Sequence, residues 1–71
     1  VIAPFTNDAL AASAQNIGCL LARKQVYFVP FRQDHWRDKP RSMTANWDRV
    51  EDALEAALAG RQVQPILEAP L

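Results

Sequence analysis

The chain has 71 residues, one cysteine and a formal net charge of zero, from eight basic and eight acidic side chains. This length allows one small domain that buries only ~60% of its unfolded surface, and a single cysteine excludes an internal disulfide. The balanced charge argues against nucleic-acid binding, no Cys/His grouping suggests a metal site, and no apolar stretch approaches the ~20 residues of a membrane span. Because 49% of the residues are hydrophobic, we expect the chain to pack against further protein: the remainder of its own chain, a second copy or a partner subunit.

The first predicted element is a strand over residues 1–5, a continuous apolar run of the kind that parallel sheets cover on both faces. The run begins without a polar lead-in, so we expect these residues to come from the middle of a longer polypeptide. A helix is predicted over residues 8–23, with Thr6 or Asn7 as its N-cap. Its apolar residues recur at helical spacing, at Leu10, Ala14, Ile17 and Leu21.

A second strand is predicted over residues 26–31, which are mostly aromatic and β-branched. Strand, helix and strand make one βαβ unit, whose right-handed crossover places the two strands parallel. A polar loop over residues 32–45 follows, then a helix over residues 47–59 that Asn46 caps. Residues 60–71 form a tail that is either a short edge strand or a docked arm. Together these elements predict that the chain is an α/β segment of βαβα order in a single domain.

Polar residues follow both predicted strands. Thr6 and Asn7 come after the first strand, and Arg32, Gln33 and Asp34 come after the second. Parallel strands end at the same edge of a sheet, where open α/β proteins place their ligands, so these residues are the two halves of a candidate site. Asn7 either orients a carboxylate or amide of a small ligand or serves only as a helix cap. Likewise, the Gln33–Asp34 pair either binds a polar ligand or closes a turn.

Other residues give no defined chemistry. His35, the only histidine, is either a proton-transfer group or an exposed loop residue, and Cys19 is best explained as a packing thiol. With two glycines the chain holds no phosphate-binding fingerprint, and it holds no nucleophilic triad. The local chemistry therefore predicts half of an α/β ligand site and no particular reaction.

Five motifs stand in a fixed order along the chain: Thr6-Asn7-Asp8-Ala9-Leu10, Ala14-Gln15-Asn16-Ile17-Gly18, Val26-Tyr27-Phe28-Val29-Pro30-Phe31 with Gln33-Asp34, Lys39-Pro40-Arg41-Ser42, and Gly60-Arg61-Gln62-Val63-Gln64-Pro65. In this order they resemble the C-terminal part of the family of dipicolinate synthase B subunits, and the resemblance extends over nearly the whole chain. It implies a flavoprotein-like, Rossmann-like fold of three layers with a parallel sheet. It also implies one component of an oxidoreductase, of which this segment alone is not expected to be active.

The resemblance implies more about function. Together with the dipicolinate synthase A subunit, which is expected to hold NAD(P), the parent protein would oxidise dihydrodipicolinate to dipicolinate in the cytoplasm of the mother cell during sporulation. Pro4-Phe5-Thr6-Asn7 is similar to the PxMN motif with which flavin-dependent decarboxylases of this group hold their substrate, which implies a ligand contact for Asn7 and FMN as cofactor.

Two positions of this chain depart from the residues that the resemblance leads us to expect. Thr6 stands where the PxMN motif has methionine, and Arg32 stands where a glycine is expected before Gln33-Asp34. A small dicarboxylate substrate would suit arginines such as Arg32 or Arg37. The alternative is a non-catalytic, flavoprotein-like segment that docks a partner subunit without binding a cofactor.

Overall fold

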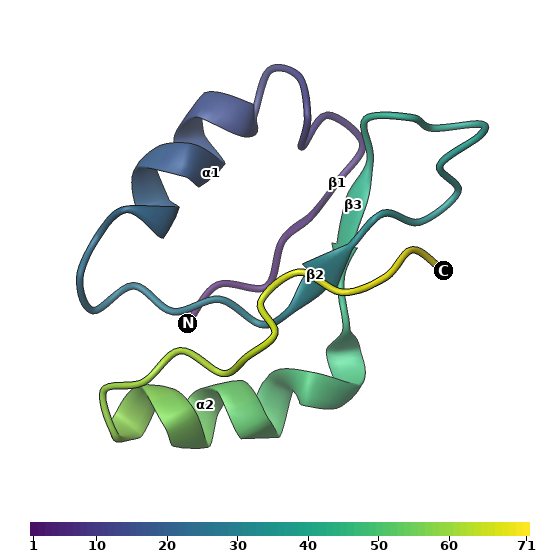
Figure 1. Cartoon of the computed structure of the whole chain (residues 1–71). Coiled ribbons are helices and arrows are strands. Elements are labelled where there is room, and N and C mark those ends of the chain that lie inside the picture. The colour runs from purple at the N-terminus through teal and green to yellow at the C-terminus, as the bar shows by residue number, and fades with distance from the viewer.

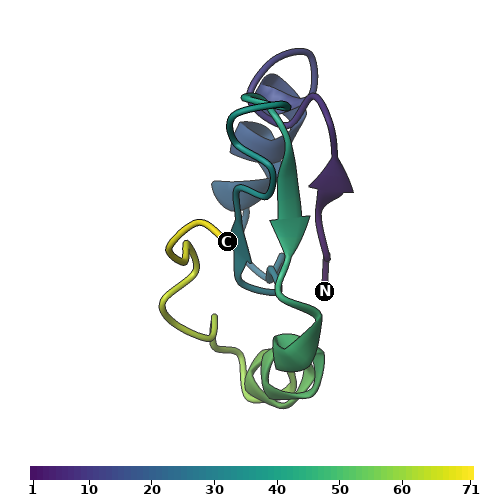
Figure 2. The ribbon, with the colours of Figure 1, turned by 90° about the vertical axis from the view of Figure 1, so that its right-hand side faces the viewer.

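Three short strands form the sheet of the computed structural model, which describes all 71 residues (Figure 1). β1 (Phe5–Thr6) and β2 (Phe31–Arg32) lie on either side of β3 (Met43–Ala45), and both pair with it in antiparallel orientation. Seen after a quarter turn, the molecule is flat (Figure 2), with extents of 37 × 24 × 14 Å. The α/β class predicted from the sequence is confirmed.

The predicted parallel pairing survives only as isolated bridges. One joins Ile2 to Phe28, so residues 1–5 and 26–31 do run parallel where they touch. The backbone N–H of Ile2 donates to the carbonyl of Tyr27 at 2.8 Å. A second parallel bridge joins Phe31 to Leu67, which docks the tail alongside β2, as Figure 1 shows. The tail is therefore a docked arm that adds one bridge to the sheet.

The antiparallel β3 is the main difference from the predicted sheet and lies inside the predicted loop of residues 32–45. Pro4 and Pro30 have no N–H group and cannot continue a parallel ladder between the two strands. Their carbonyls instead accept from the chain that enters between them, Pro4 from the N–H of Ala45 at 2.6 Å and Pro30 from that of Asn46 at 2.7 Å. The three-stranded sheet of this segment is therefore antiparallel, and the predicted parallel pairing is present only at the isolated bridges.

The first helix starts later than predicted. α1 (Ala14–Leu21) begins after Ser13, and neither Thr6 nor Asn7 caps it. The carboxylate of Asp8 instead accepts from the Thr6 hydroxyl at 2.5 Å and from the Ser13 hydroxyl at 2.8 Å. Such local side-chain bonds compete with helical hydrogen bonding, so the segment before Ala14 forms turns.

The second helix follows the predicted pattern. η1 (Trp47–Arg49) is a 3₁₀ turn that continues into α2 (Val50–Leu58), and the predicted cap is present because the Asn46 side chain accepts from the N–H of Asp48 at 3.1 Å. After α2, Gly60 adopts a positive φ of 73°. This conformation favours glycine and turns the chain toward the tail.

Two apolar clusters lie on opposite faces of the extended segment that contains Phe28 and Val29. Phe28 joins Ala9, Phe31 and Met43 and packs against residues of α1, whereas its neighbour Val29 joins Ala45 and Ala53 and packs with α2. Successive residues of an extended chain point to opposite faces, so α1 packs on one face of this segment and α2 packs on the other. Neither helix has the length and apolarity that crossing a membrane requires.

Candidate functional site

The structure brings two of the predicted site residues together through a third. The hydroxyl of Ser42, which directly precedes β3, donates to Oδ1 of Asp34 at 2.7 Å and lies 3.5 Å from Oδ1 of Asn7. Ser42 is 1% exposed, whereas Asn7 is exposed and Asp34 is half-buried. The two predicted halves thus meet around a buried hydroxyl at the start of β3.

Thr6 and Gln33 are near this cluster but are used locally. Thr6 donates to Asp8, and the amide nitrogen of Gln33 donates to the carbonyl of Pro40 at 2.9 Å. Of these two, Gln33 thereby closes the loop that carries Asp34, which is the structural alternative that the sequence left open. Both side chains shape the surroundings of Asn7 and Asp34, and their contact with a ligand stays a prediction.

Arg32 takes a different direction from the rest of the predicted set. Its guanidinium lies 3.5 Å from Glu68 of the docked tail, where Arg49 also approaches at 3.4 Å and the Asn46 amide donates at 2.9 Å. Both arginine side chains and Glu68 are largely buried. Nε of Arg32 is buried without any hydrogen-bond acceptor. Arg32 therefore anchors the tail and is already engaged by a carboxylate.

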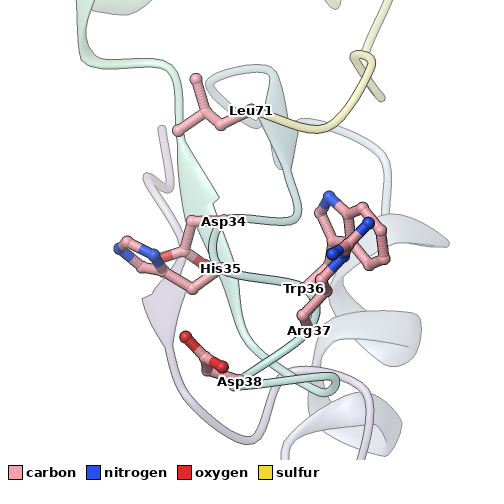
Figure 3. A pocket seen from close by; sticks show the side chains of 6 residues that line it. All are labelled: Asp34, His35, Trp36, Arg37, Asp38 and Leu71. Atoms are coloured by element: carbon pink, nitrogen blue, oxygen red, sulfur yellow. The ribbon is translucent and has the colours of Figure 1, made fainter.

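A shallow cleft of about 390 Å³ lies beside Asp34. It is lined by Asp34, His35, Trp36, Arg37, Asp38 and Leu71. Figure 3 shows His35 and Asp38 on one side of this loop and Trp36 with Arg37 on the other. The guanidinium carbon of Arg37 lies 4.9 Å from the centre of the Trp36 ring, within range of a cation–π contact. The cleft thus combines a flat aromatic surface with both signs of charge.

One carboxylate beside the cluster has a shifted acidity. Hydrogen bonds from the Thr6 hydroxyl and then from the Ser13 hydroxyl hold the pKa of Asp8 below its ordinary value, because they favour the ionised carboxylate. Asp8 is therefore a fixed negative charge that holds the turn after Asn7. No group of three or more His, Cys, Asp or Glu side chains is placed to hold a metal ion.

Reasoning from the sequence assigned no role to Ser42, Arg49 or Glu68. Ser42 lies in a polar loop where nothing in the pattern marks it as buried. Glu68 meets Arg32 across 36 positions of the chain, a separation for which local patterns carry no signal. The one available hint was the motif Lys39-Pro40-Arg41-Ser42, which includes the buried serine.

The two comparisons with known proteins that found a match give the same family. No protein-family model matches the chain. The dipicolinate synthase B subunit of Bacillus subtilis (strain 168) is 42% identical over 67 residues, which make up 94% of this chain and 34% of that protein. A crystal structure of the dipicolinate synthase B subunit from Bacillus halodurans matches 97% of this chain with a TM-score of 0.93 and 42% identity, and the match covers 35% of its length. The chain belongs to the family of dipicolinate synthase B subunits and spans about a third of the length of these two relatives.

Proposed function

We propose that this chain contributes one edge of the ligand site in the B subunit of a dipicolinate synthase. With the A subunit, this protein would oxidise dihydrodipicolinate to dipicolinate in the mother-cell cytoplasm of a spore-forming bacterium. The observation that carries this proposal is the meeting of Asn7 and Asp34 around Ser42 in a chain 42% identical to a dipicolinate synthase B subunit.

The proposed division of labour follows from the chemistry. Oxidising the dihydropyridine ring removes a hydride and a proton, and the NAD(P) held by the A subunit would accept the hydride. The groups that this chain adds are polar and positioning: the exposed amide of Asn7, which can donate and accept, and the guanidinium of Arg37 at the cleft. No acid or base in this stretch is assigned to the chemical step.

The charges of the cleft limit how it binds a dicarboxylate. Asp34 and Asp38 line it together with one arginine, Arg37, while Arg32 is engaged by Glu68. A dianion would therefore take one favourable contact here, from Arg37, and would meet repulsion from the two aspartates. We propose that Arg37 and Asn7 hold one end of the substrate and that the remaining positive charge comes from outside these 71 residues.

FMN fits this stretch poorly. A flavin phosphate binds where several backbone N–H groups or basic side chains converge, and the cleft beside Asp34 instead presents two carboxylates and no glycine. The motif position that would match a flavin-group methionine is Thr6, which is bonded to Asp8. If FMN binds to the whole protein, we propose that its phosphate contacts lie elsewhere, and we assign no step of this chain to a flavin.

The test combines the purified protein with a dipicolinate synthase A subunit, NAD(P) and dihydrodipicolinate, and measures dipicolinate formation. Asn7→Ala should lower kcat/KM by about 5- to 150-fold, the equivalent of losing a polar contact worth about 1–3 kcal/mol. The matched control is Asn16→Ala, which removes an exposed asparagine amide from α1 and should leave the rate unchanged. Equal rates with and without this protein would contradict the proposal.

A second function rests on a separate observation. An apolar groove of about 230 Å³ runs along α1, and its lining includes Leu10, Leu21 and Leu67, which are 52%, 44% and 59% exposed. Such a surface suits a segment that docks a partner subunit without binding a cofactor. Two results together would favour this docking role over a ligand-site role. Leu21→Glu would abolish binding of the A subunit, and the binding of the A subunit to the wild-type protein would not change when a dicarboxylate or flavin is added.

A further inference from the structure

Ser42 is a polar residue that is almost fully buried. It is 1% exposed and is followed by the buried strand β3. Its backbone N–H donates to the carbonyl of Lys39 at 3.1 Å, which fixes the residue at the end of the loop. A buried hydroxyl needs hydrogen-bond partners to offset its lost hydration. Its partners lie on two separate parts of the chain, 35 and 8 positions away.

The hydroxyl has one proton, and the distances show where it goes. At 2.7 Å from the Asp34 carboxylate it makes a short, charge-assisted hydrogen bond. The oxygen of Ser42 then faces Asn7 with its lone pairs, and Oδ1 of Asn7 lies 3.5 Å away as a second acceptor. A half-turn of the Asn7 amide exchanges Oδ1 for Nδ2 and supplies the donor that this position needs. With the amide turned in this way, Asn7 would donate to Ser42 and Ser42 to Asp34, in one directed chain.

The partners have few other contacts. The side chain of Asn7 makes no further hydrogen bond within the protein, and the carboxylate of Asp34 makes none besides that with Ser42. An exposed asparagine without a partner samples several rotamers. Ser42 is thus the one group able to set the orientation of the Asn7 amide while it holds the loop that carries Asp34.

We infer that Ser42 is the positioning residue of the candidate site: it orients the Asn7 amide and ties it to the Asp34 loop at the edge of the cleft. This inference rests on the proposed function for its consequence in turnover, but not for its structural content. Ser42 itself is buried and does not contact a ligand. Its effect reaches the ligand through the direction of the Asn7 amide.

The first experiment needs no activity. In the purified protein, NMR should show one of the two Asn7 side-chain amide protons displaced from the chemical shift of an unrestrained asparagine and slowed in solvent exchange. Ser42→Ala, which removes the hydroxyl with little change in volume, should return the shift and the exchange rate of that proton to those of an unrestrained asparagine. Ser42→Thr, which keeps a hydroxyl, should restore the wild-type signals. The matched control is Thr44→Val, since Thr44 on β3 is also buried but its hydroxyl donates only to the carbonyl of Ala45, at 3.3 Å.

The second experiment asks whether the orientation matters for turnover with the A subunit. Ser42→Ala should lower kcat/KM by ~10-fold or more, because misplacing a contact by about 1 Å costs up to ~100-fold. In the Asn7→Ala background the same change should have little further effect. Thr44→Val should leave turnover unaltered.

The outcomes separate the two ideas. Unchanged Asn7 signals in Ser42→Ala overturn the positioning role, whatever the activity. If the Asn7 signals of the wild-type protein are restrained but the protein has no effect on dipicolinate formation, the proposed function is overturned and the positioning role stands. If Ser42→Ala fails to fold, Asp34→Asn serves instead, because a neutral amide weakens the charge-assisted bond and should shift the same Asn7 signals; no shift there also counts against the inference.

Discussion

The side-chain amide of Gln62 replaces a missing strand neighbour of Phe28. Its oxygen accepts from the N–H of Phe28 at 2.8 Å, and its nitrogen donates to the carbonyl of the same residue at 2.7 Å. The residues are 34 positions apart, and Phe28 is 1% exposed. Gln62→Ala would leave a backbone donor and a backbone acceptor without partners in the core.

The magnitude follows from those two groups. A typical internal hydrogen bond contributes about 1 kcal/mol net, and a buried group left unpaired costs about 1–3 kcal/mol. Gln62→Ala should therefore lower the free energy of unfolding by about 2–4 kcal/mol, out of the roughly 4–11 kcal/mol expected for a chain of this size. The corresponding drop in Tm is roughly 10–25 °C. Urea denaturation monitored by tryptophan fluorescence measures the change.

Two variants refine the test. Gln62→Glu keeps the acceptor but loses the donor to Phe28, so it should also destabilise the fold. Gln64→Ala is the matched control, because the side chain of Gln64 accepts only from the N–H of Ile66 at an exposed position, and its loss should cost less than about 0.5 kcal/mol. A Gln62→Ala protein within about 0.5 kcal/mol of wild type would refute the reasoning.

Three further predictions concern other contacts. Phe28→Ala should cost about 3–5 kcal/mol in urea unfolding, whereas Leu58→Ala, at a side chain that is 91% exposed, should cost less than about 0.5 kcal/mol; equal losses would contradict the assigned core. Glu68→Gln should cost about 1–3 kcal/mol, since it removes the charge that pairs two mostly buried arginines, and unchanged stability would show that the tail does not depend on it. The pKa of Asp8 is lowered in the folded state, so its ionised carboxylate stabilises the protein above the unfolded pKa. The free energy of unfolding of the wild-type protein should therefore exceed that of Asp8→Asn by a constant amount near neutral pH, and this difference should vanish as pH falls through the folded pKa. A difference that grows in acid would be inconsistent with this shift.

The sequence predicted the edge where polar residues meet, and the structure explains why only part of the set arrives there. Asn7 and Asp34 follow two segments that touch in parallel at the Ile2–Phe28 bridge, so strand-end reasoning placed them near each other. Arg32 is one residue earlier than Gln33 and turns to the tail instead. A ligand role for each of these residues remains a prediction.

The missed features depend on contacts between distant residues. β3 has three residues, too few for a periodic pattern, and it forms because the prolines before β1 and β2 offer free carbonyls. The late start of α1 depends on Asp8 finding two hydroxyl partners, which compete with a helix that the apolar spacing alone would extend. In both places a small number of hydrogen bonds outweighed the local hydrophobic pattern.

Gln62 and the docked tail lie near the end of this sequence, and this position affects how the protein folds while it is synthesised. A ribosome releases the middle segment around Phe28 well before it releases residues 62–68, which satisfy one edge of that segment. Until then, an apolar strand with open backbone groups is available to other chains, the kind of exposure that promotes aggregation. Slow translation or a break in the chain before residue 62 would prolong that interval, so the yield of folded protein would depend on how quickly the tail follows.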